Sequence, residues 1–232
     1  GDSSPRVVPA AGMTDATSSP PTVTSLTVYP VKSCGGVSLQ SARVSATGLL
    51  FDRAWMVVLA PRTKKSPRAR DGRKRSATPR AASMFVSQRT DPKLALVRAT
   101  LPEEISREDW DGESLRDDAK MTLRAEGMAS RLEISLLCEK PLRRVSVGVW
   151  EWVGVAGDEG DAAAAWFSEL LGKSVRLVRW LGDGSLPRAA IESARGVGGG
   201  GGGAVERSAK EKALVGALAA FAAAAALRVP DA

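Results

Sequence analysis

Short apolar stretches, most of them alternating with polar residues, follow one another through much of the first 150 residues. Leu26 and Val28 alternate with polar neighbours, and Trp55–Leu59 is a continuous apolar run. Alternation is typical of a half-buried strand, and a short apolar run with branched residues is typical of a buried one. Similar stretches lie at 37–46, 84–88, 94–97, 121–123, 132–136 and 145–149. At least seven short strands separated by turns predict a barrel-like β architecture.

One segment near residue 165 has the pattern of a helix. Asp161 is placed to cap it, Ala162–Ala165 favour helix, and Gly172 is suited to end it. A strand is predicted to follow over Val175–Trp180. The predicted fold class is therefore mainly β with α (α+β), in which one helix packs on a barrel of short strands.

Composition divides the chain into a globular part and three other segments. Residues 1–21 are rich in Pro, Ser, Ala and Thr and predict a disordered leader, and residues 22–182 form the expected domain. A glycine-rich linker is expected over 183–207, followed by an alanine-rich helical tail over 208–232. The tail falls short of the roughly 20 strongly apolar residues of a membrane span. A surface helix, a poorly packed tail, a membrane span and a non-native C-terminus remain alternatives for it.

Positive charge is concentrated in one segment. The chain has a net charge of +7, and residues 61–83 carry nine basic residues and one acidic residue, which leaves −1 for all other residues. This segment has three prolines and no apolar periodicity, so we expect a disordered insertion in a hairpin between 55–59 and 84–88. A nucleic-acid-binding fold would more often spread such charge over a folded face. Non-specific polyanion binding by this loop is the weaker alternative, and no specific nucleic acid is expected.

The titratable residues exclude several classes of site. The chain has no histidine, which removes Ser-His-Asp catalysis, Cys-His catalysis and histidine-ligated zinc. Its two cysteines, Cys34 and Cys138, are too few for a zinc cluster or a disulfide framework and favour reduced thiols in an intracellular protein. No catalytic residue and no metal ligand is assigned from the sequence.

Two motifs carry candidate binding chemistry. Lys32 and Ser33 follow a strand that ends at Pro30 and precede Gly35 and Gly36, so that a point charge, a hydroxyl and a turn with exposed N–H groups can cradle an anion such as phosphate. The alternative is a solvated turn with an ordinary surface lysine.

Arg53 is the third candidate, at the start of the apolar run 55–59. An arginine in that position needs an anion, which is either a protein carboxylate such as Asp52 or a ligand. A structural salt bridge and an anion site are therefore both open for Arg53.

Four motifs together resemble one known family. "YPVKSCGGV" at 29–37, "GLLFDRAWMVV" at 48–58 and "QRTDPKLALV" at 88–97 resemble the start of the MOSC N-terminal β-barrel domain. "GDEGDAAAAWFSELLGKSVRLVRW" at 157–180 resembles the segment that joins this barrel to the MOSC domain. The resemblance covers about two-thirds of the chain and is to the mitochondrial amidoxime reducing components and the C-terminal region of molybdenum cofactor sulfurases.

This resemblance implies binding of a pterin-dithiolene molybdenum cofactor (molybdopterin). In the reducing components the Lys and Ser of "VKS" and the Arg of "DR" contact the cofactor, which implies cofactor-binding roles for Lys32, Ser33 and Arg53. The insertion 61–83 departs from the family pattern. Nothing after residue 182 resembles the family's molybdenum-ligating cysteine region, so we expect a chain that is truncated before the end of the MOSC domain and inactive by itself.

Two functions follow from the resemblance. The first is part of a molybdenum-dependent oxidoreductase that reduces N-hydroxylated compounds with electrons from heme and flavin partner proteins. The alternative is a cofactor-binding or carrier module, as in the sulfurase C-terminal region, and the pyridoxal phosphate of the sulfurase is not expected on this chain. The expected compartment is the cytoplasm or the mitochondrion.

Overall fold

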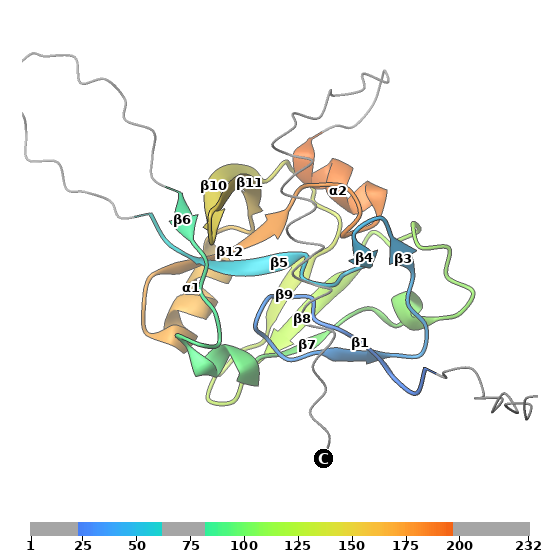
Figure 1. The fold of residues 1–232 in the computed structure, drawn as a ribbon, viewed down its shortest axis with the longest axis horizontal. Helices are drawn as coiled ribbons and strands as arrows, with labels where there is room; N and C mark the ends of the chain where they lie inside the picture. Colours follow the sequence, from blue (N-terminus) through green and yellow to red (C-terminus); the bar gives the residue numbers. More distant parts are fainter. Residues whose placement is uncertain (1–22, 62–81, 197–232) are drawn as a thin grey trace, which may run out of the picture.

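A computed structural model describes residues 23–61 and 82–196 as twelve short strands and two α-helices, with two 3-10 helices between them (Figure 1). The strands are β1 Leu26–Val28, β2 Val37–Leu39, β3 Val44–Ser45, β4 Gly48–Leu49, β5 Trp55–Leu59, β6 Ser83–Met84, β7 Arg98–Thr100, β8 Lys120–Arg124, β9 Leu132–Ser135, β10 Arg143–Val149, β11 Trp152–Asp158 and β12 Val175–Trp180. The helices are α1 Asp161–Leu171, α2 Arg188–Arg195, η1 Pro92–Leu96 and η2 Glu103–Ser106. The predicted mainly-β fold is confirmed.

The main sheet has five strands in the order β5-β12-β11-β10-β6 and nearly closes on itself. β10 and β11 form the longest hairpin, in which Val149 pairs with Trp152. Just after β6, Phe85 makes an antiparallel bridge to Val58, and the Val86 N–H donates to the Val57 carbonyl at 2.7 Å. Because Val57 and Val58 belong to β5, the two edges of the sheet meet, as a barrel requires.

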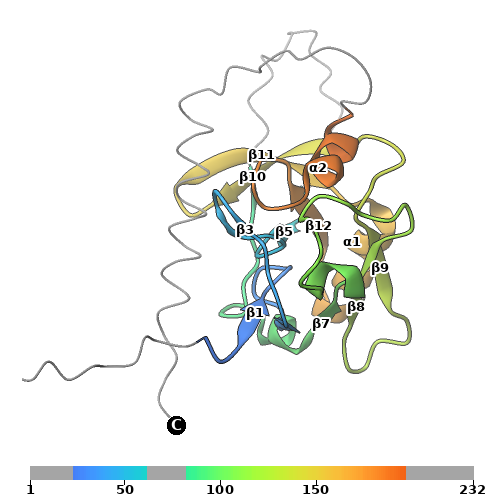
Figure 2. The ribbon, with the colours of Figure 1, turned by 90° about the vertical axis from the view of Figure 1, so that its right-hand side faces the viewer.

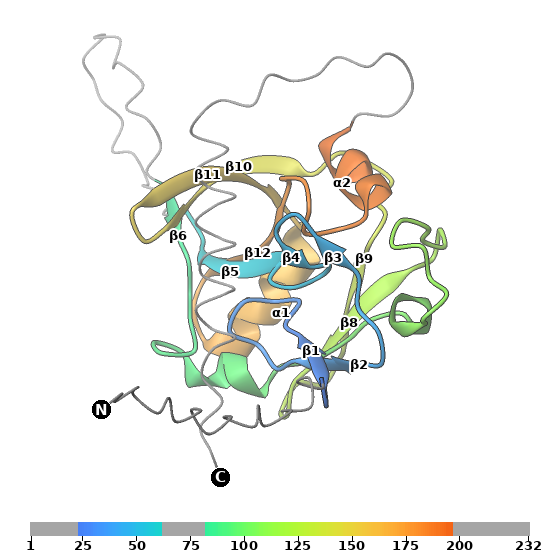
Figure 3. The same ribbon diagram turned by 45° about the vertical axis from the view of Figure 1, so that its right-hand side comes forward.

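A second layer consists of the three-stranded antiparallel sheet β7-β8-β9. Figure 3 shows α1 between this layer and the main sheet, where it contacts β12 on one side and β9 on the other. In Figure 2 the β10–β11 hairpin crosses the top of the molecule and β7, β8 and β9 lie below it. The larger apolar core fills the space between the layers, and Phe167 of α1 is fully buried there. A smaller core of Val58, Val147, Ala156 and Val178 fills the barrel.

The two-stranded sheets β1-β2 and β3-β4 and the helix α2 complete the fold. Helix α2 buries Ala190, Ile191 and Ala194, and the Leu142 N–H donates to the Ala194 carbonyl. Within the linker expected over 183–207, residues 188–195 form helix α2 instead, and its Ala190 and Ile191 belong to the larger core. An eight-residue helix with one buried stripe is short enough to be missed beside the long glycine run.

Three local predictions differ from the structure, and one strand was missed. Ser83–Met84 pairs with β10 in parallel, so the predicted hairpin with β5 is reduced to the contacts of Phe85 and Val86. Residues 94–97 are not a strand, because Pro92 begins a 3-10 helix there. The N-cap of α1 is Gly160 and Asp161 is the first helical residue. Strand β11 was not predicted.

The remaining sequence predictions concern segments outside the described residues. These are the leader 1–21, nearly all of the insertion 61–83, the linker beyond residue 196 and the tail 208–232. Within the ranges 23–61 and 82–196, no helix is long and apolar enough to cross a membrane.

Candidate functional site

The two loops that carry Lys32 and Arg53 are joined by main-chain hydrogen bonds. The Arg53 N–H donates to the Tyr29 carbonyl at 2.7 Å, and the Lys32 N–H donates to the Trp55 carbonyl at 2.8 Å. The Trp55 N–H donates back to the Pro30 carbonyl at 3.0 Å. Segments more than 20 residues apart in the sequence are thus held in contact. We call residues 29–34 and 51–54 the paired loops.

The paired loops bring positive charges together. Burial lowers the pKa of Lys32, and the nearby charges of Arg53 and Arg89 lower it further. The Lys32 ammonium lies 4.4 Å from the centre of the Phe85 ring, and the Arg53 guanidinium carbon lies 5.2 Å from that of Tyr29. Because these neighbouring positive charges repel one another, a bound anion would be favoured here. The structure thus brings Lys32 and Arg53 together.

Arg53 also has a partner within the protein, as expected if it forms a structural salt bridge. Its guanidinium forms an ion pair with the neighbouring Asp52 carboxylate, which also accepts the Tyr29 N–H at 2.8 Å. The Arg53 side chain is 21% exposed. Asp52 therefore fixes the arginine in position while leaving part of its guanidinium accessible.

Four non-glycine residues in the described ranges have a positive φ, and three belong to the paired loops. Ser33, Phe51 and Arg53 have φ values of 70°, 67° and 53°, and the fourth, Trp150, has 55°. Such residues are uncommon outside glycine, and they cluster at functional sites where the surrounding structure holds them. For Ser33 the structure fixes this backbone conformation, and the role of its hydroxyl stays a prediction.

Gly35 is needed because the loop approaches another strand closely. A Cβ at this position would lie 2.6 Å from the Arg98 guanidinium and 2.9 Å from the Val97 carbonyl oxygen. The Gly35 N–H donates to that same Val97 carbonyl at 2.8 Å. The glycine therefore lets the Lys32–Ser33 turn dock on the residue just before β7.

A small pocket adjoins Arg53 at one end of the barrel. It has a volume of about 30 Å³, and its walls come from β5, β10, β11 and β12. Arg53, Val149, Gly154 and Trp180 are among its lining residues. The pocket is mostly apolar, and Arg53 is its one charged lining residue. This end of the barrel lies next to the β10–β11 turn.

A buried ion pair contacts Trp55, the residue that follows the second of the paired loops. Arg179 is completely buried and donates to Glu159 at 2.7 Å and to the Leu136 and Ser135 carbonyls. The Trp55 indole N–H donates to the same Glu159 carboxylate at 2.6 Å. Since the Trp55 main chain bonds to Pro30 and Lys32 and directly follows residues 51–54 in the sequence, this network anchors the paired loops to β12.

Sequence reasoning missed Arg89, Phe85 and Trp150 as neighbours of the site. Phe85 and Arg89 follow the basic insertion, and Trp150 lies in the β10–β11 turn. Arg89 is part of the "QRTDPK" motif, which offered the one sequence signal for any of them. Their proximity to Lys32 depends on the order of strands in the barrel.

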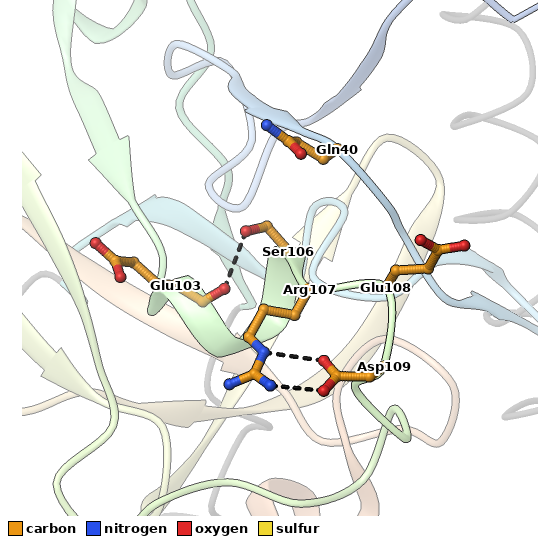
Figure 4. Close-up of a pocket in the computed structure, with 6 residues that line it drawn as sticks. All are labelled: Gln40, Glu103, Ser106, Arg107, Glu108 and Asp109. Atoms are coloured by element: carbon orange, nitrogen blue, oxygen red, sulfur yellow. Dashed lines mark hydrogen bonds and ion pairs between the residues drawn. The ribbon is translucent and has the colours of Figure 1, made fainter.

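A second hollow carries none of the predicted residues. It is open, has a volume of about 560 Å³ and is lined by Gln40, Glu103, Ser106, Arg107, Glu108 and Asp109 (Figure 4). The Arg107 guanidinium is paired with the Asp109 carboxylate at 2.6 Å. The remaining charges there are negative, so this hollow does not suit a phosphate.

The described residues offer no obvious metal ligand set. Within 23–61 and 82–196 no three His, Cys, Asp or Glu side chains are grouped closely enough to hold a metal ion. Burial raises the pKa of the Cys34 thiol to about 12 and also raises that of Cys138. Both thiols therefore stay protonated at neutral pH, and metals bind the thiolate.

Comparison with known proteins gives one family and several relatives. The family model described as the MOSC N-terminal beta barrel domain matches residues 20–174. Mitochondrial amidoxime reducing component 2 of Bos taurus is 32% identical over 155 residues, which are 65% of this chain and 35% of the relative. Molybdenum cofactor sulfurase of Danio rerio is 27% identical over 165 residues, which are 68% of this chain and 15% of the relative. This chain thus spans about a third or less of the length of these relatives.

Proposed function

The chain belongs to the MOSC N-terminal beta barrel domain family, and we propose that its paired loops hold the anionic end of a pterin-dithiolene molybdenum cofactor. Lys32 and Arg53 would bind the phosphate by charge, and Ser33 would donate a short hydrogen bond. The names of its relatives, a molybdenum cofactor sulfurase and an amidoxime reducing component, are consistent with this assignment.

The observation that carries the proposal is the placement of Lys32. Its ammonium is half-buried between an aromatic ring and two arginines, and burial and these charges lower its pKa. A bound anion would offset both the repulsion from the arginines and the lost hydration of the ammonium. The left-handed backbone of Ser33 and Arg53 supports the same assignment.

The residues present fit the phosphate end of the cofactor. When bound, the cofactor would supply two-electron redox chemistry at its metal. The paired loops would bind and orient the phosphate, and Asp52 would keep the Arg53 fork aimed at it. No metal ligand is assigned to the described residues.

Direct binding to the 232-residue chain tests the proposal. We expect inorganic phosphate to bind, and Lys32→Ala and Arg53→Ala each to weaken it roughly tenfold or more, as loss of a charge-assisted hydrogen bond does. Lys120→Ala is the matched control, because Lys120 is an exposed cation on β8 that is paired with Glu133. Calorimetric titration measures the affinities. Phosphate affinity that is equal in the parent, both site variants and the control would sink the proposal.

Within this proposal, the activity is that of the oxidoreductase type, the reduction of N-hydroxylated compounds with electrons from heme and flavin partner proteins. The prediction that the 232-residue chain is inactive is tested by expressing it with a supply of cofactor. Stoichiometric molybdenum in the purified chain, together with turnover of an N-hydroxylated compound, would contradict it. Retention of cofactor without turnover would favour the carrier module instead, which is consistent with the sulfurase relative.

A further inference from the structure

Trp150 is a large aromatic residue in an unusual position. It is 55% exposed in the turn between β10 and β11, and its φ is 55°. In a two-residue hairpin turn, a positive φ at the first central position favours glycine, because glycine has no Cβ to clash. The chain therefore presents an exposed indole at a backbone position that costs it free energy.

Trp150 is joined to the anion site through one ring. The Trp150 and Phe85 rings meet edge to face with their centres 5.1 Å apart, and the Lys32 ammonium lies 4.4 Å from the centre of the Phe85 ring. Lys32 and Trp150 are thus neighbours of the same side chain. Val149, which precedes Trp150, lines the same small pocket as Arg53. Both charged candidates are therefore linked to the turn.

The aromatic neighbours differ in how they are held. Phe85 is half-buried and packs against the barrel core, whereas Trp150 is more exposed than buried. An indole face next to a cationic cluster can bind a planar ring whose side chain carries a phosphate. A purely electrostatic phosphate site would gain nothing from this exposed tryptophan.

We propose that Trp150 packs against the ring system of the ligand whose phosphate Lys32 and Arg53 hold. This inference rests on the proposed function and adds to it a second contact, which selects ring-bearing phosphates over inorganic phosphate. Phe85 is a positioning residue, because it contacts both the indole and the Lys32 ammonium. The ligand class is a phosphorylated planar heterocycle.

Two probes separate the ring contact from the phosphate contact. A fluorescent pterin with a phosphate ester on its side chain carries both groups, and inorganic phosphate carries one. Trp150→Ala is expected to weaken binding of the phosphorylated pterin roughly tenfold, the size of a lost stacking contact, and to leave phosphate affinity unchanged. Trp150→Phe should restore most of the pterin affinity. Lys32→Ala should weaken both probes.

Val153→Ala is the matched control, because Val153 is 66% exposed on the adjoining strand β11. It should change neither affinity. Circular dichroism would check the fold of each variant, and Trp150→Leu replaces Trp150→Ala if the alanine variant does not fold.

The outcomes distinguish the two claims. If Lys32→Ala weakens phosphate binding but Trp150→Ala leaves pterin affinity within twofold of the parent, the ring contact is wrong and the anion site stands. If Trp150→Ala weakens both probes equally, the tryptophan acts through Lys32 and the ring contact is again wrong. If Lys32→Ala changes neither probe, the proposed function itself fails.

Discussion

Arg179 and Arg53 are two arginines at neighbouring ends of β12 and β5 with opposite surroundings. Arg179 is fully buried, and its guanidinium donates hydrogen bonds to Glu159 and to two main-chain carbonyls. Arg53 is partly exposed, paired with its sequence neighbour Asp52 and close to the cation Lys32. An arginine surrounded by acceptors supports the fold, whereas we propose that Arg53, held beside another cation, binds a ligand. The difference can be tested by removing charges on each side.

The largest effect is expected on the buried side. Glu159→Ala leaves the Arg179 guanidinium without its carboxylate and takes the acceptor from the Trp55 indole N–H. Breaking a buried pair in this way costs about 3–5 kcal/mol of unfolding free energy. Urea denaturation of the parent and the variant measures the loss.

Glu133→Ala is the matched control, since it removes a carboxylate from a surface pair with Lys120. That change should cost at most about 1 kcal/mol. Equal losses for Glu133→Ala and Glu159→Ala would show that the buried Arg179–Glu159 pair contributes no more to stability than a surface pair.

A smaller effect is expected at Asp158, whose arginine partners are less buried than Arg179. Burial raises the pKa of Asp158, but hydrogen bonds from Arg176 and from the Gly160 N–H outweigh it, so the pKa lies below its ordinary value of 3.8. The stabilisation is therefore present above about pH 4 and is lost as the pH falls through the lower folded-state value. Asp158→Asn should cost about 1–3 kcal/mol at pH 7.

The pH dependence identifies this carboxylate. Unfolding free energy measured from pH 5 down to pH 2 should fall for the parent and fall less steeply for Asp158→Asn. Parallel curves for the two proteins would show that Asp158 titrates alike in the folded and unfolded chain.

The contrast between these regions also marks what the sequence could predict. Lys32, Ser33 and Arg53 stood out because a lysine, a hydroxyl and an arginine flank short strands at turns. The strands themselves followed from alternation, which is a local property. Nothing local shows that Arg179 is buried. It lies between two apolar residues of β12, and an exposed arginine on a strand has the same kind of sequence neighbours.

Arg89, Phe85 and Trp150 were unpredictable for a related reason. They reach the site because Ser83–Met84 pairs with β10 and Phe85 bridges to Val58 of β5. Strand order in a barrel is a non-local property, and here the 61–83 insertion separates Phe85 from β5 in the sequence. The predicted hairpin correctly placed Phe85 beside β5, but it did not predict the contact with the β10–β11 turn.

Trp150 offers a test in which two variants should differ in stability but not in binding. Both Trp150→Gly and Trp150→Ala remove the indole and its contact with Phe85, but only glycine adopts a φ of 55° without strain. Trp150→Gly should therefore be more stable than Trp150→Ala by about 1 kcal/mol, while both bind the phosphorylated pterin equally weakly. Thermal denaturation measures the stability difference. An alanine variant as stable as the glycine variant would show that the turn relaxes and stores no strain.

The smallest effect is expected at Lys32, and its sign is the reverse of that at Glu159. Burial and the charges of Arg53 and Arg89 lower the Lys32 pKa below 10.5, so at neutral pH the folded chain holds a proton that its surroundings disfavour. Lys32→Met removes the charge and keeps an apolar contact with Phe85. It should raise unfolding free energy by less than about 1 kcal/mol, because solvent screens a half-exposed charge.

The advantage of Lys32→Met should depend on pH and on anions. Between the lowered pKa and 10.5 the unfolded parent binds more protons than the folded parent, so the parent gains stability as the pH rises through this window and the two proteins converge. Phosphate should stabilise the parent and not Lys32→Met, since a ligand that binds the folded state alone stabilises it by mass action. Urea denaturation at pH 7 and pH 10, each with and without phosphate, measures both effects. A Lys32→Met variant less stable than the parent in phosphate-free buffer at pH 7 would mean that Lys32 supports the fold as Arg179 does, and the contrast between the two regions would be lost.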